Sequence, residues 1–486
     1  MGYAIVRLRS GGGVEAMADR EQEWQIFIEN REAVLEALKR GECDGILPAA
    51  RGFLDGFAEF LLEAGILEAF EQFPDNRQRR TIPIFFFCDV LVYRPLFHLK
   101  RIAPIERTLF RSPYIMRQMG FNAMQMEQGF YQTPEGQRPF TAQAIPECFA
   151  KAKAEDFLNH QQQVLRRIVA YCPAQFLHGL WVMDSIHFHI PRGAHTASVE
   201  FKACVLGVWQ EGVVWPLLWA FVPSSENETV VGKRVFTAAE DVLGKGFIRH
   251  LLIDRGYLDG RWITQLYRRG TRVTIGVKED MLLFEEMKNL MHLEDTVWTD
   301  VEPPKLHDRP RPKRRITGFE DLEGEWSSCK APLSGCLVED LYPDRVVYQG
   351  LVTTARAAEA TEILTDNGRR WTLEEVYMTL TRYWDFDDLP PCRPSVAYAL
   401  VHFALIAFTL LGFHQQETDA ADELETWNKA PPPLPMPERE LAIYAGPFFA
   451  LLLPSDLVSI ILTHNSAWQA NRKRLLMALR LCEGNT

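Results

Sequence analysis

At the stretch Phe176–Ile190, with the sequence FLHGLWVMDSIHFHI, this chain of 486 residues changes from mostly helical periodicity to strand-like runs. Two further runs rich in apolar, aromatic and β-branched residues follow it, Ala197–Trp209 and Val213–Val222. The last two runs are separated only by Gln210-Glu-Gly212, a spacing typical of a tight hairpin turn. The sequence therefore predicts three successive strands.

After the third run the pattern changes to alternating helices and strands. Glu228–Leu243 has helical periodicity and leads to the apolar strand Ile248–Ile253. A second, shorter helix, Asp259–Arg269, is followed by a fifth strand, Thr271–Lys278. Three hairpin-linked strands followed by strand–helix crossovers form a mixed sheet flanked by helices. We therefore predict an α/β core.

Three carboxylates lie at the ends or starts of elements. Asp184 closes the run GLWVMD, Asp254 directly follows the fourth strand, and Glu374 opens the helix-like segment Thr372–Tyr383. A single aspartate at a strand end is usually a cap or turn residue. Three carboxylates in such places indicate one divalent-metal site, because carboxylate oxygens suit Mg²⁺. Glu375 follows Glu374, but helical geometry turns it roughly 100° away, so we expect only Glu374 to face the site.

The motifs around these acids resemble those of the DDE transposases of bacterial insertion sequences, in the branch with a β-rich insertion before the Glu. Asp254-Arg-Gly-Tyr257 is similar to the family's Asp-x-Gly-aromatic motif, and Arg370-Trp-Thr-Leu-Glu374 is similar to its Arg-x₃-Glu motif. The likeness covers residues 176–413. The predicted order of strands and helices is also that of the ribonuclease H-like fold.

Asp184-Ser resembles the family's first-strand motif, and two other positions depart from its pattern. Asn367 stands where the family often has Tyr, three residues before the Arg. Thr381 stands where it often has a DNA-contacting Lys, and Arg382 lies next to it. Neither departure affects an expected metal ligand.

The resemblance implies a ribonuclease H-like mixed sheet with a β-rich insertion and a helical N-terminal domain. It also implies a metal-dependent DNA endonuclease and strand transferase with Asp184, Asp254 and Glu374 as its catalytic residues. These three would hold two Mg²⁺ ions, on the order of 4 Å apart, for which Mn²⁺ can substitute. One ion activates the attacking water or 3′-hydroxyl, and the other stabilises the leaving oxygen.

The partners implied are double-stranded DNA, as transposon ends and as target, and a second subunit in a synaptic homodimer. The expected location is the bacterial cytoplasm, on the nucleoid when DNA is bound, with no membrane association. The residues expected to contact DNA are Arg370, Arg382, Tyr257, Lys305, Arg309, Arg311, Lys313, Arg314 and Arg315.

Two alternative functions share these motifs. One is a ribonuclease H-like nuclease that cuts DNA without joining strands. The other is a domesticated or inactive transposase that acts only as a DNA-binding protein. Strand-transfer products distinguish the first alternative, and the intact triad argues against the second.

The expected boundaries follow these changes of texture. We expect a leader and a first helix (20–40) in residues 1–44, followed by a helical N-terminal DNA-recognition domain in 45–175. The catalytic core is expected in 176–278 plus 351–414, interrupted by an insertion subdomain in 279–350 with paired strands at 335–340 and 345–353. A linker and a helical C-terminal tail are expected in 415–486.

Composition and charge narrow the class of protein. A net charge of −11 argues against a protein that coats nucleic acid by charge alone. The nine cysteines include no Cys-x₂-Cys pair and read as reduced core thiols. No secretory signal is expected at the N-terminus. The apolar segments Ser395–Phe413 and Leu441–Leu462 are expected to be a core helix and a broken buried pair of helices, in preference to membrane spans.

Weaker candidates carry competing interpretations. His187 and His189 share a strand face and could bind a metal, but we expect site-lining or structural roles. Trp298 or Trp326 could stack on an unpaired base, although packing is expected for both. The basic run 305–315 is expected to be exposed and mobile, either a solvated loop or a DNA contact.

Overall fold

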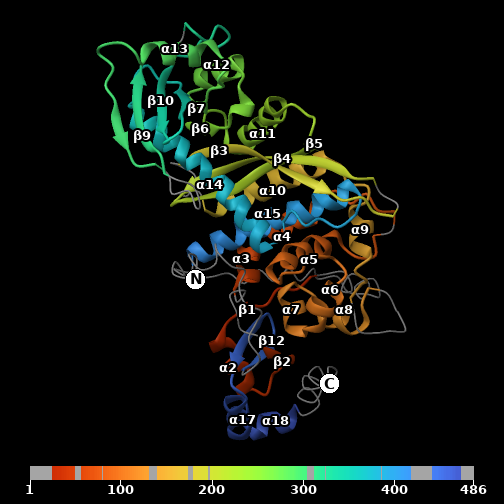
Figure 1. Cartoon of the computed structure of the whole chain (residues 1–486). Coiled ribbons are helices and arrows are strands. Elements are labelled where there is room, and N and C mark those ends of the chain that lie inside the picture. The colour runs from red at the N-terminus through yellow and green to blue at the C-terminus, as the bar shows by residue number, and fades with distance from the viewer. Residues whose placement is uncertain are drawn as a thin grey trace. The chain divides into compact units, whose positions relative to one another are not determined.

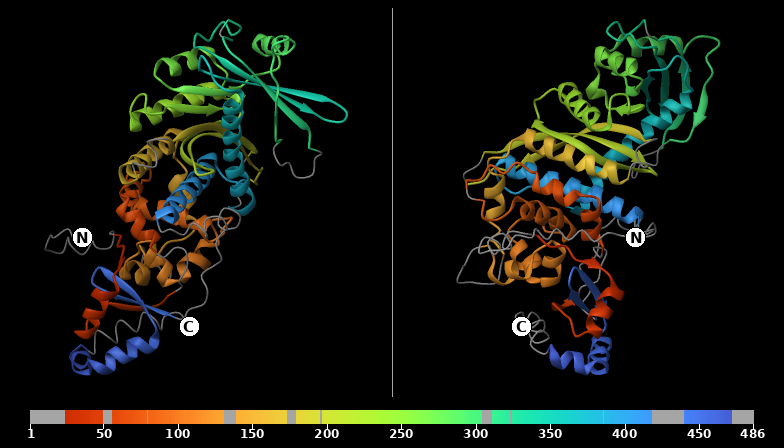
Figure 2. Two further views of the ribbon diagram at one scale, coloured as in Figure 1. Left: turned by 90° about the vertical axis from the view of Figure 1, so that its left-hand side faces the viewer. Right: turned by 180° about the vertical axis from the view of Figure 1, so that it is seen from behind.

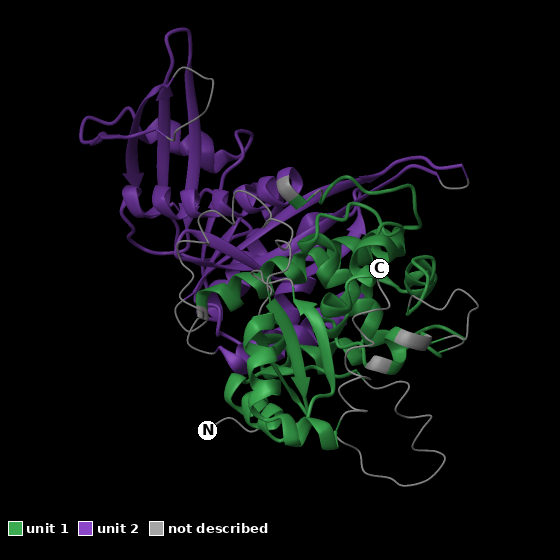
Figure 3. Cartoon of the chain, turned by 90° about the horizontal axis from the view of Figure 1, so that it is seen from below, with its two compact units in different colours: residues 1–156, 383–486 green, residues 157–382 purple. Residues whose placement is uncertain are grey.

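The computed structural model describes residues 24–49, 56–78, 80–130, 139–172, 179–194, 197–303, 311–322, 324–384, 386–417 and 440–471. The chain divides into two compact units (Figure 3). Unit 1 comprises residues 1–156 and 383–486, and unit 2 comprises residues 157–382. The predicted triad lies entirely in unit 2.

The sheet of unit 2 begins, in chain order, with the three predicted strands (Figure 1). They are β3 (Leu180–Ile190), β4 (Val199–Gln210) and β5 (Val213–Pro223), each antiparallel to its neighbour. Glu211 and Gly212 join β4 to β5 with positive φ angles of 49° and 88°. Such a pair matches the right-handed twist of the two flanking strands, which accounts for the tight hairpin.

Two parallel strands extend the sheet from β3. These are β6 (His250–Ile253), parallel to β3, and β7 (Arg272–Gly276), parallel to β6. Helices α11 (Glu228–Leu243) and α12 (Gly260–Arg268) form the two crossovers. The order β5-β4-β3-β6-β7 is therefore that of a mixed sheet flanked by helices, and the predicted sequence of elements is confirmed.

The segment expected to form an insertion subdomain continues this same sheet. After helix α13 (Leu282–Leu290), its strands add in the order β11-β10-β9-β8, and β11 pairs with β7 in antiparallel fashion. The predicted strand pair is found as β10 and β11. The bounds are β8 (Thr299–Val301), β9 (Lys313–Phe319), β10 (Ser334–Leu341) and β11 (Val346–Thr353). One sheet of nine strands results.

Two helices of unit 2 complete the setting of the triad. Gln161 of α10 (Ala154–Tyr171) donates a hydrogen bond of 2.8 Å to the Leu217 carbonyl, which ties that helix to β5. The 25-residue helix α14 (Ala360–Trp384) follows β11 and is drawn in cyan in Figure 2. Its middle turns carry the predicted third acid.

Unit 1 is mostly helical, as predicted for the N-terminal region. The apolar helix α15 (Pro394–Glu417) packs on α5 (Ile84–Leu96), and the guanidinium of Arg94 in α5 donates a hydrogen bond to the Leu400 carbonyl of α15. The other helical elements are α3 (Phe57–Glu63), α4 (Ile66–Glu71), α6 (Ile105–Thr108), η1 (Leu109–Arg111), α7 (Pro113–Gln118), α8 (Ala123–Gln128) and α9 (Ala144–Phe149).

Helix α15 is the apolar segment that raised the question of a membrane span. Among the described residues it is the one helix long and apolar enough to cross a bilayer, and 94% of its apolar window is buried inside the protein. Such burial is typical of the core helix of a soluble protein, and agrees with the expected role of this segment.

A small sheet in unit 1 corrects the prediction of a helical tail. Strands β12 (Glu440–Ala445) and β13 (Phe448–Leu452) form a hairpin around Gly446, whose φ is 59°. Short apolar runs bounded by glycine and proline fit strands and buried helices equally well, and here the strands form. The remaining elements are β1 (Ile28–Glu29), β2 (Gly45–Ala49), α2 (Arg31–Lys39), α17 (Pro454–Thr463) and α18 (Asn465–Ala470). The predicted first helix thus begins at Arg31 rather than at residue 20.

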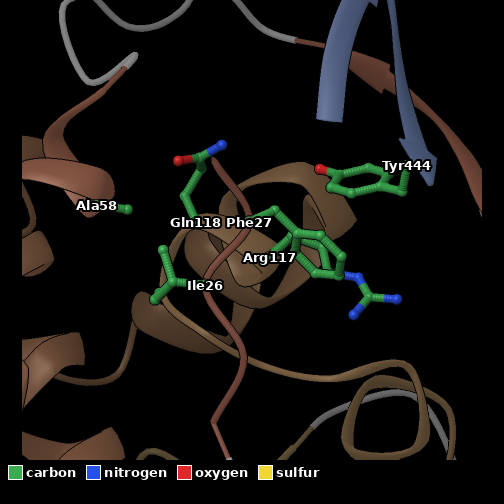
Figure 4. A pocket seen from close by; sticks show the side chains of 6 residues that line it. All are labelled: Ile26, Phe27, Ala58, Arg117, Gln118 and Tyr444. Carbon is green, nitrogen blue, oxygen red and sulfur yellow. The ribbon is translucent and has the colours of Figure 1, made fainter. Parts of the chain in front are cut away.

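The buried cation Arg117 is one of the residues that line a small hollow in unit 1 (Figure 4). The Arg117 guanidinium carbon lies 5.1 Å from the ring centre of Phe27 and 5.7 Å from that of Tyr444. Cation–π contacts of this kind stabilise a desolvated guanidinium. Arg117, in α7, therefore contacts both Phe27, just before β1, and Tyr444 of β12.

The largely buried His250 at the start of β6, with 20% of its side chain exposed, should make stability depend on pH. Its Nε2 atom lies 3.0 Å from Thr274 Oγ1 and 3.3 Å from Asp366 Oδ2. Burial, reinforced by Arg272, lowers the pKa of His250 from 6.5 to about 4. As the pH falls below 6.5, His250 becomes protonated in the unfolded chain, whereas in the folded protein it stays neutral until about pH 4. The free energy of unfolding therefore decreases between pH 6.5 and pH 4, by up to about 3 kcal/mol.

Chemical unfolding of the parent and of His250→Gln between pH 7 and pH 4 measures this effect. The variant should lose less stability than the parent over that range. Parallel curves for the two proteins would show that His250 does not titrate in this way.

Candidate active site: three carboxylates on one guanidinium

The register of two parallel strands brings the two aspartates together. Met183 of β3 pairs with Ile253 of β6, and Asp184 and Asp254 are the next residues along each strand. Asp184 Oδ1 accepts a hydrogen bond of 2.8 Å from the backbone N–H of Ser185. Asp254 caps the 3₁₀ turn η3 (Arg255–Tyr257), where its Oδ2 accepts 3.1 Å from the N–H of Gly256.

Helix α14 supplies the third acid together with a cation. Arg370 and Glu374 are one turn apart and share a face of the helix. Arg370 Nη1 lies 2.5 Å from Asp184 Oδ2, 3.5 Å from Asp254 Oδ1 and 3.2 Å from Glu374 Oε1. The expected convergence of the three carboxylates is therefore found, whereas their role as metal ligands stays a prediction. Glu375 is exposed, which also agrees with the expected helix faces.

The donor set fits a hard divalent cation, but the arginine stands among the donors. Asp184, Asp254 and Glu374 offer only carboxylate oxygens, the ligand type that Mg²⁺ prefers. As they stand, no three His, Cys, Asp or Glu side chains in the described part of the chain are arranged to hold a metal ion. The Arg370 side chain occupies the point that the three acids share, and it is only 7% exposed.

The electrostatics of the centre follow from its burial. The pKa of Asp184 is raised to about 7, chiefly by burial; Arg370 opposes this shift, and the charges of Asp254 and Glu374 add to it. Burial also raises the pKa of Glu374, again opposed by Arg370. The guanidinium is therefore the group that opposes protonation of Asp184 and Glu374, although burial outweighs it at both.

Tyr257, which was expected to contact DNA, lies instead beneath the site. It is fully buried, and its hydroxyl lies 2.7 Å from Ser185 Oγ and 3.0 Å from Cys204 Sγ. A buried phenol needs such partners, and burial within the fold prevents a direct contact with DNA. Tyr257 thus supports β3 and β4 from inside the fold.

Apart from Arg370, the basic residues predicted to bind DNA are either exposed, or paired with acids of β10, or outside the described residues. Arg382, at the end of α14, is exposed, as are Arg311 and Lys313. Arg314 makes two hydrogen bonds of 2.7 Å to Asp340. Arg315 likewise pairs with Glu339. Lys305 and Arg309 lie outside the described residues.

The expectation that the basic run is mobile is therefore wrong for its last three residues. Residues 313–315 begin strand β9, where Arg314 and Arg315 face acids of β10. The proline spacing predicted a loop, but cross-strand ion pairs stabilise extended backbone here. These two arginines are already paired within the sheet, whereas Lys313 projects to solvent.

The other candidates have packing partners. Arg315 lies 4.4 Å from the ring centre of Trp298, and Trp326 is buried. His187 is 3.9 Å from Glu228, and His189 is 3.4 Å from Ser198 Oγ. None of these four predicted candidates contacts the three carboxylates.

Two residues near the site were missed by the sequence analysis. Lys202 is only 4% exposed, and its ammonium lies 3.6 Å from Glu228 Oε1. Glu228, the first residue of α11, also rests against Gly256. A charged residue inside the apolar run of β4 was the available signal for Lys202, whereas Glu228 reads as an ordinary first-turn acid.

A glycine of α11 sets the position of Tyr257. A Cβ atom on Gly232 would lie 2.6 Å from Tyr257 Cε1 and 2.9 Å from Met183 Sδ, which is closer than such atoms approach. Gly232→Ala should therefore destabilise the protein by about 1–3 kcal/mol, the usual cost of overpacking.

Gly368→Ala is the matched control for that substitution. Gly368 also lies within a helix, α14, but nothing stands within 4 Å of its Cβ position. Because alanine favours helix over glycine, this variant should gain up to about 1 kcal/mol. Equal shifts of the urea midpoint in the two variants would contradict the close approach at Gly232.

Fold and site together define an α/β protein with a partly buried cluster of three carboxylates. No protein-family model matches the chain, and no curated protein matches it. A solved structure of the piggyBac transposase synaptic complex with hairpin DNA is similar over 77% of this chain and 78% of that chain, with 9% sequence identity and a TM-score of 0.38. Because a likeness this distant carries no argument, function must be inferred from the residues of the site.

Proposed function

We propose that the chain is a metal-dependent DNA transposase that cleaves at transposon ends and joins the freed 3′-hydroxyl to target DNA. The observation that carries the proposal is the meeting of Asp184, Asp254 and Glu374 at one point from two neighbouring parallel strands and a helix. Their motifs are those through which the sequence resembles DDE transposases. The strand order β5-β4-β3-β6-β7 supports a ribonuclease H-like core.

The chain's own residues have distinct tasks in this proposal. Asp184, Asp254 and Glu374 would hold two divalent ions, Mg²⁺ or Mn²⁺. When bound, such ions supply activation of a water or hydroxyl nucleophile and stabilisation of the leaving oxygen. Ser185 and Gly256 fix the two aspartates through backbone N–H groups, so each keeps one oxygen directed at the shared point.

DNA contact would fall to exposed basic side chains. Arg382, Arg311 and Lys313 are exposed and would meet phosphates, which supply most of the affinity in nucleic-acid binding. As the resemblance implies, two subunits would bind two ends. The setting would be an insertion sequence active in the bacterial cytoplasm.

The test uses the purified full chain with DNA taken from either side of its own gene. With Mg²⁺, the proposal expects nicks at terminal inverted repeats and covalent joining of those ends to a plasmid. Nicks without joined products would assign a ribonuclease H-like nuclease instead. Binding without cleavage in Mg²⁺ or Mn²⁺ would leave a DNA-binding protein and contradict the proposal.

A further inference from the structure

Arg370 occupies the place where a metal ion would find its ligands. In the described part of the chain, each acid of the triad has this guanidinium as its ion-pair partner, and the closest contact is 2.5 Å, to Asp184. A divalent ion takes carboxylate oxygens at about 2 Å. An ion about 2 Å from all three oxygens would have to lie where Arg370 Nη1 now stands, so the two cations must compete for one place.

Electrostatics accounts for the position of Arg370 among the three carboxylates. Three carboxylates crowded into a buried site repel one another, and their repulsion would drive them apart or protonate them. The planar guanidinium presents several N–H donors at once and is always charged, so a single side chain bridges all three. Arg370 therefore holds the three carboxylates together around one cation.

A neighbouring residue offers the guanidinium an alternative position. Trp371 is 50% exposed, and the Arg370 guanidinium carbon is already 5.2 Å from its ring centre. Indole faces attract guanidinium groups. A rotation of the side chain toward this exposed ring would take the charge out of the carboxylate cluster while keeping it at the edge of the site.

We propose that Arg370 is an internal counter-cation that preorganises the three carboxylates and is expelled when a divalent metal ion binds. This inference rests on the proposed function, because it takes the triad as the metal site. The expelled guanidinium rests on Trp371 and is there available to a phosphate of bound DNA. Arg370 therefore contacts DNA only in the metal-loaded protein.

The first measurement is Mn²⁺ affinity, by calorimetry, for the full-length parent, Arg370→Gln and Arg370→Lys. Removal of the competing charge in Arg370→Gln should tighten Mn²⁺ binding by about tenfold. Arg370→Lys keeps the charge and should stay near the parent. Arg268→Gln removes one exposed positive charge from α12 and serves as the matched control, with unchanged affinity expected.

The second measurement needs no variant and so does not depend on the folding of Arg370→Gln. Phenylglyoxal modifies accessible arginines, and peptide mass spectrometry reports the modification of Arg370. Its rate should rise severalfold when the parent is saturated with Mn²⁺, while the rate at Arg268 stays constant.

The outcomes separate this inference from the proposed function. If alanine at Asp184 or Asp254 abolishes Mn²⁺ binding but Arg370→Gln binds no tighter and Arg370 stays protected in the parent, the counter-cation role is overturned and the metal site stands. If the parent binds no Mn²⁺ that depends on these acids, the proposed function fails first.

Discussion

Alanine at Asp184, Asp254 or Glu374 should lower Mg²⁺-dependent nicking of end DNA by at least about 10³-fold, since metal ions contribute several kcal/mol to the transition state. Each acid supplies an oxygen to the point where the three converge, and the other two cannot replace it. Gel assays on labelled end DNA measure this loss. Binding to the same DNA should largely survive, because affinity comes from Lys and Arg contacts elsewhere.

Glu375→Ala is the matched control for the third acid. Glu375 is exposed on α14, so its removal should leave nicking close to the parent's rate. The reverse result, with Glu375 essential and Glu374 dispensable, would move the third ligand by one residue. Full activity after loss of Asp184 or Asp254 would remove the carboxylate mechanism altogether.

Tyr257→Ala should destabilise the protein by about 3–5 kcal/mol, the usual cost of truncating a large buried aromatic side chain. The ring is fully buried, and its hydroxyl is held between Ser185 and Cys204. Tyr257→Phe keeps the ring and loses only the hydrogen bonds, so about 1–3 kcal/mol is expected. Urea unfolding measures both effects.

Tyr267 provides the control, since it is a tyrosine of α12 with 38% of its surface exposed. Tyr267→Ala should change stability by no more than about 0.5 kcal/mol. If Tyr257→Ala were as stable as this control but bound DNA more weakly, Tyr257 would be a surface DNA contact after all. The structure leads us to expect instead that Tyr257→Ala is much less stable than Tyr267→Ala.

The order of elements in the first part of unit 2 was predictable from sequence because its signals are local. β3, β4 and β5 are long apolar runs separated by short turns, and Glu211-Gly212 supplies the backbone angles that a hairpin needs. The acids were predictable for a related reason. Residues at the ends of neighbouring parallel strands meet at one edge of the sheet, so Asp184 and Asp254 had to come close once β3 and β6 paired.

Features decided by tertiary pairing were not predictable in the same way. β12 and β13 are apolar runs whose length fits either strand or helix, and the partner β2, almost 400 residues earlier in sequence, stabilises the strand form. β9 pairs its arginines with acids of β10, a choice that the proline-rich sequence before it does not reveal.

Within the site, sequence alone identified Arg370 but not its position. Its spacing from Glu374 places it on the same helix face, and that geometry is local. Whether the guanidinium points to solvent or to the carboxylates depends on the two aspartates, Asp184 and Asp254, that α14 meets when it packs on the sheet. Tyr257 illustrates the same limit, because a strong motif match did not distinguish a supporting residue from a contacting one.

Anomalous diffraction from crystals soaked in Mn²⁺ tests whether the three acids form a metal centre. The proposal predicts a manganese peak bounded by carboxylate oxygens of Asp184, Asp254 and Glu374 at about 2 Å, with the Arg370 guanidinium moved away from them. A saturated crystal with manganese bound elsewhere and Arg370 still among the three carboxylates would contradict it.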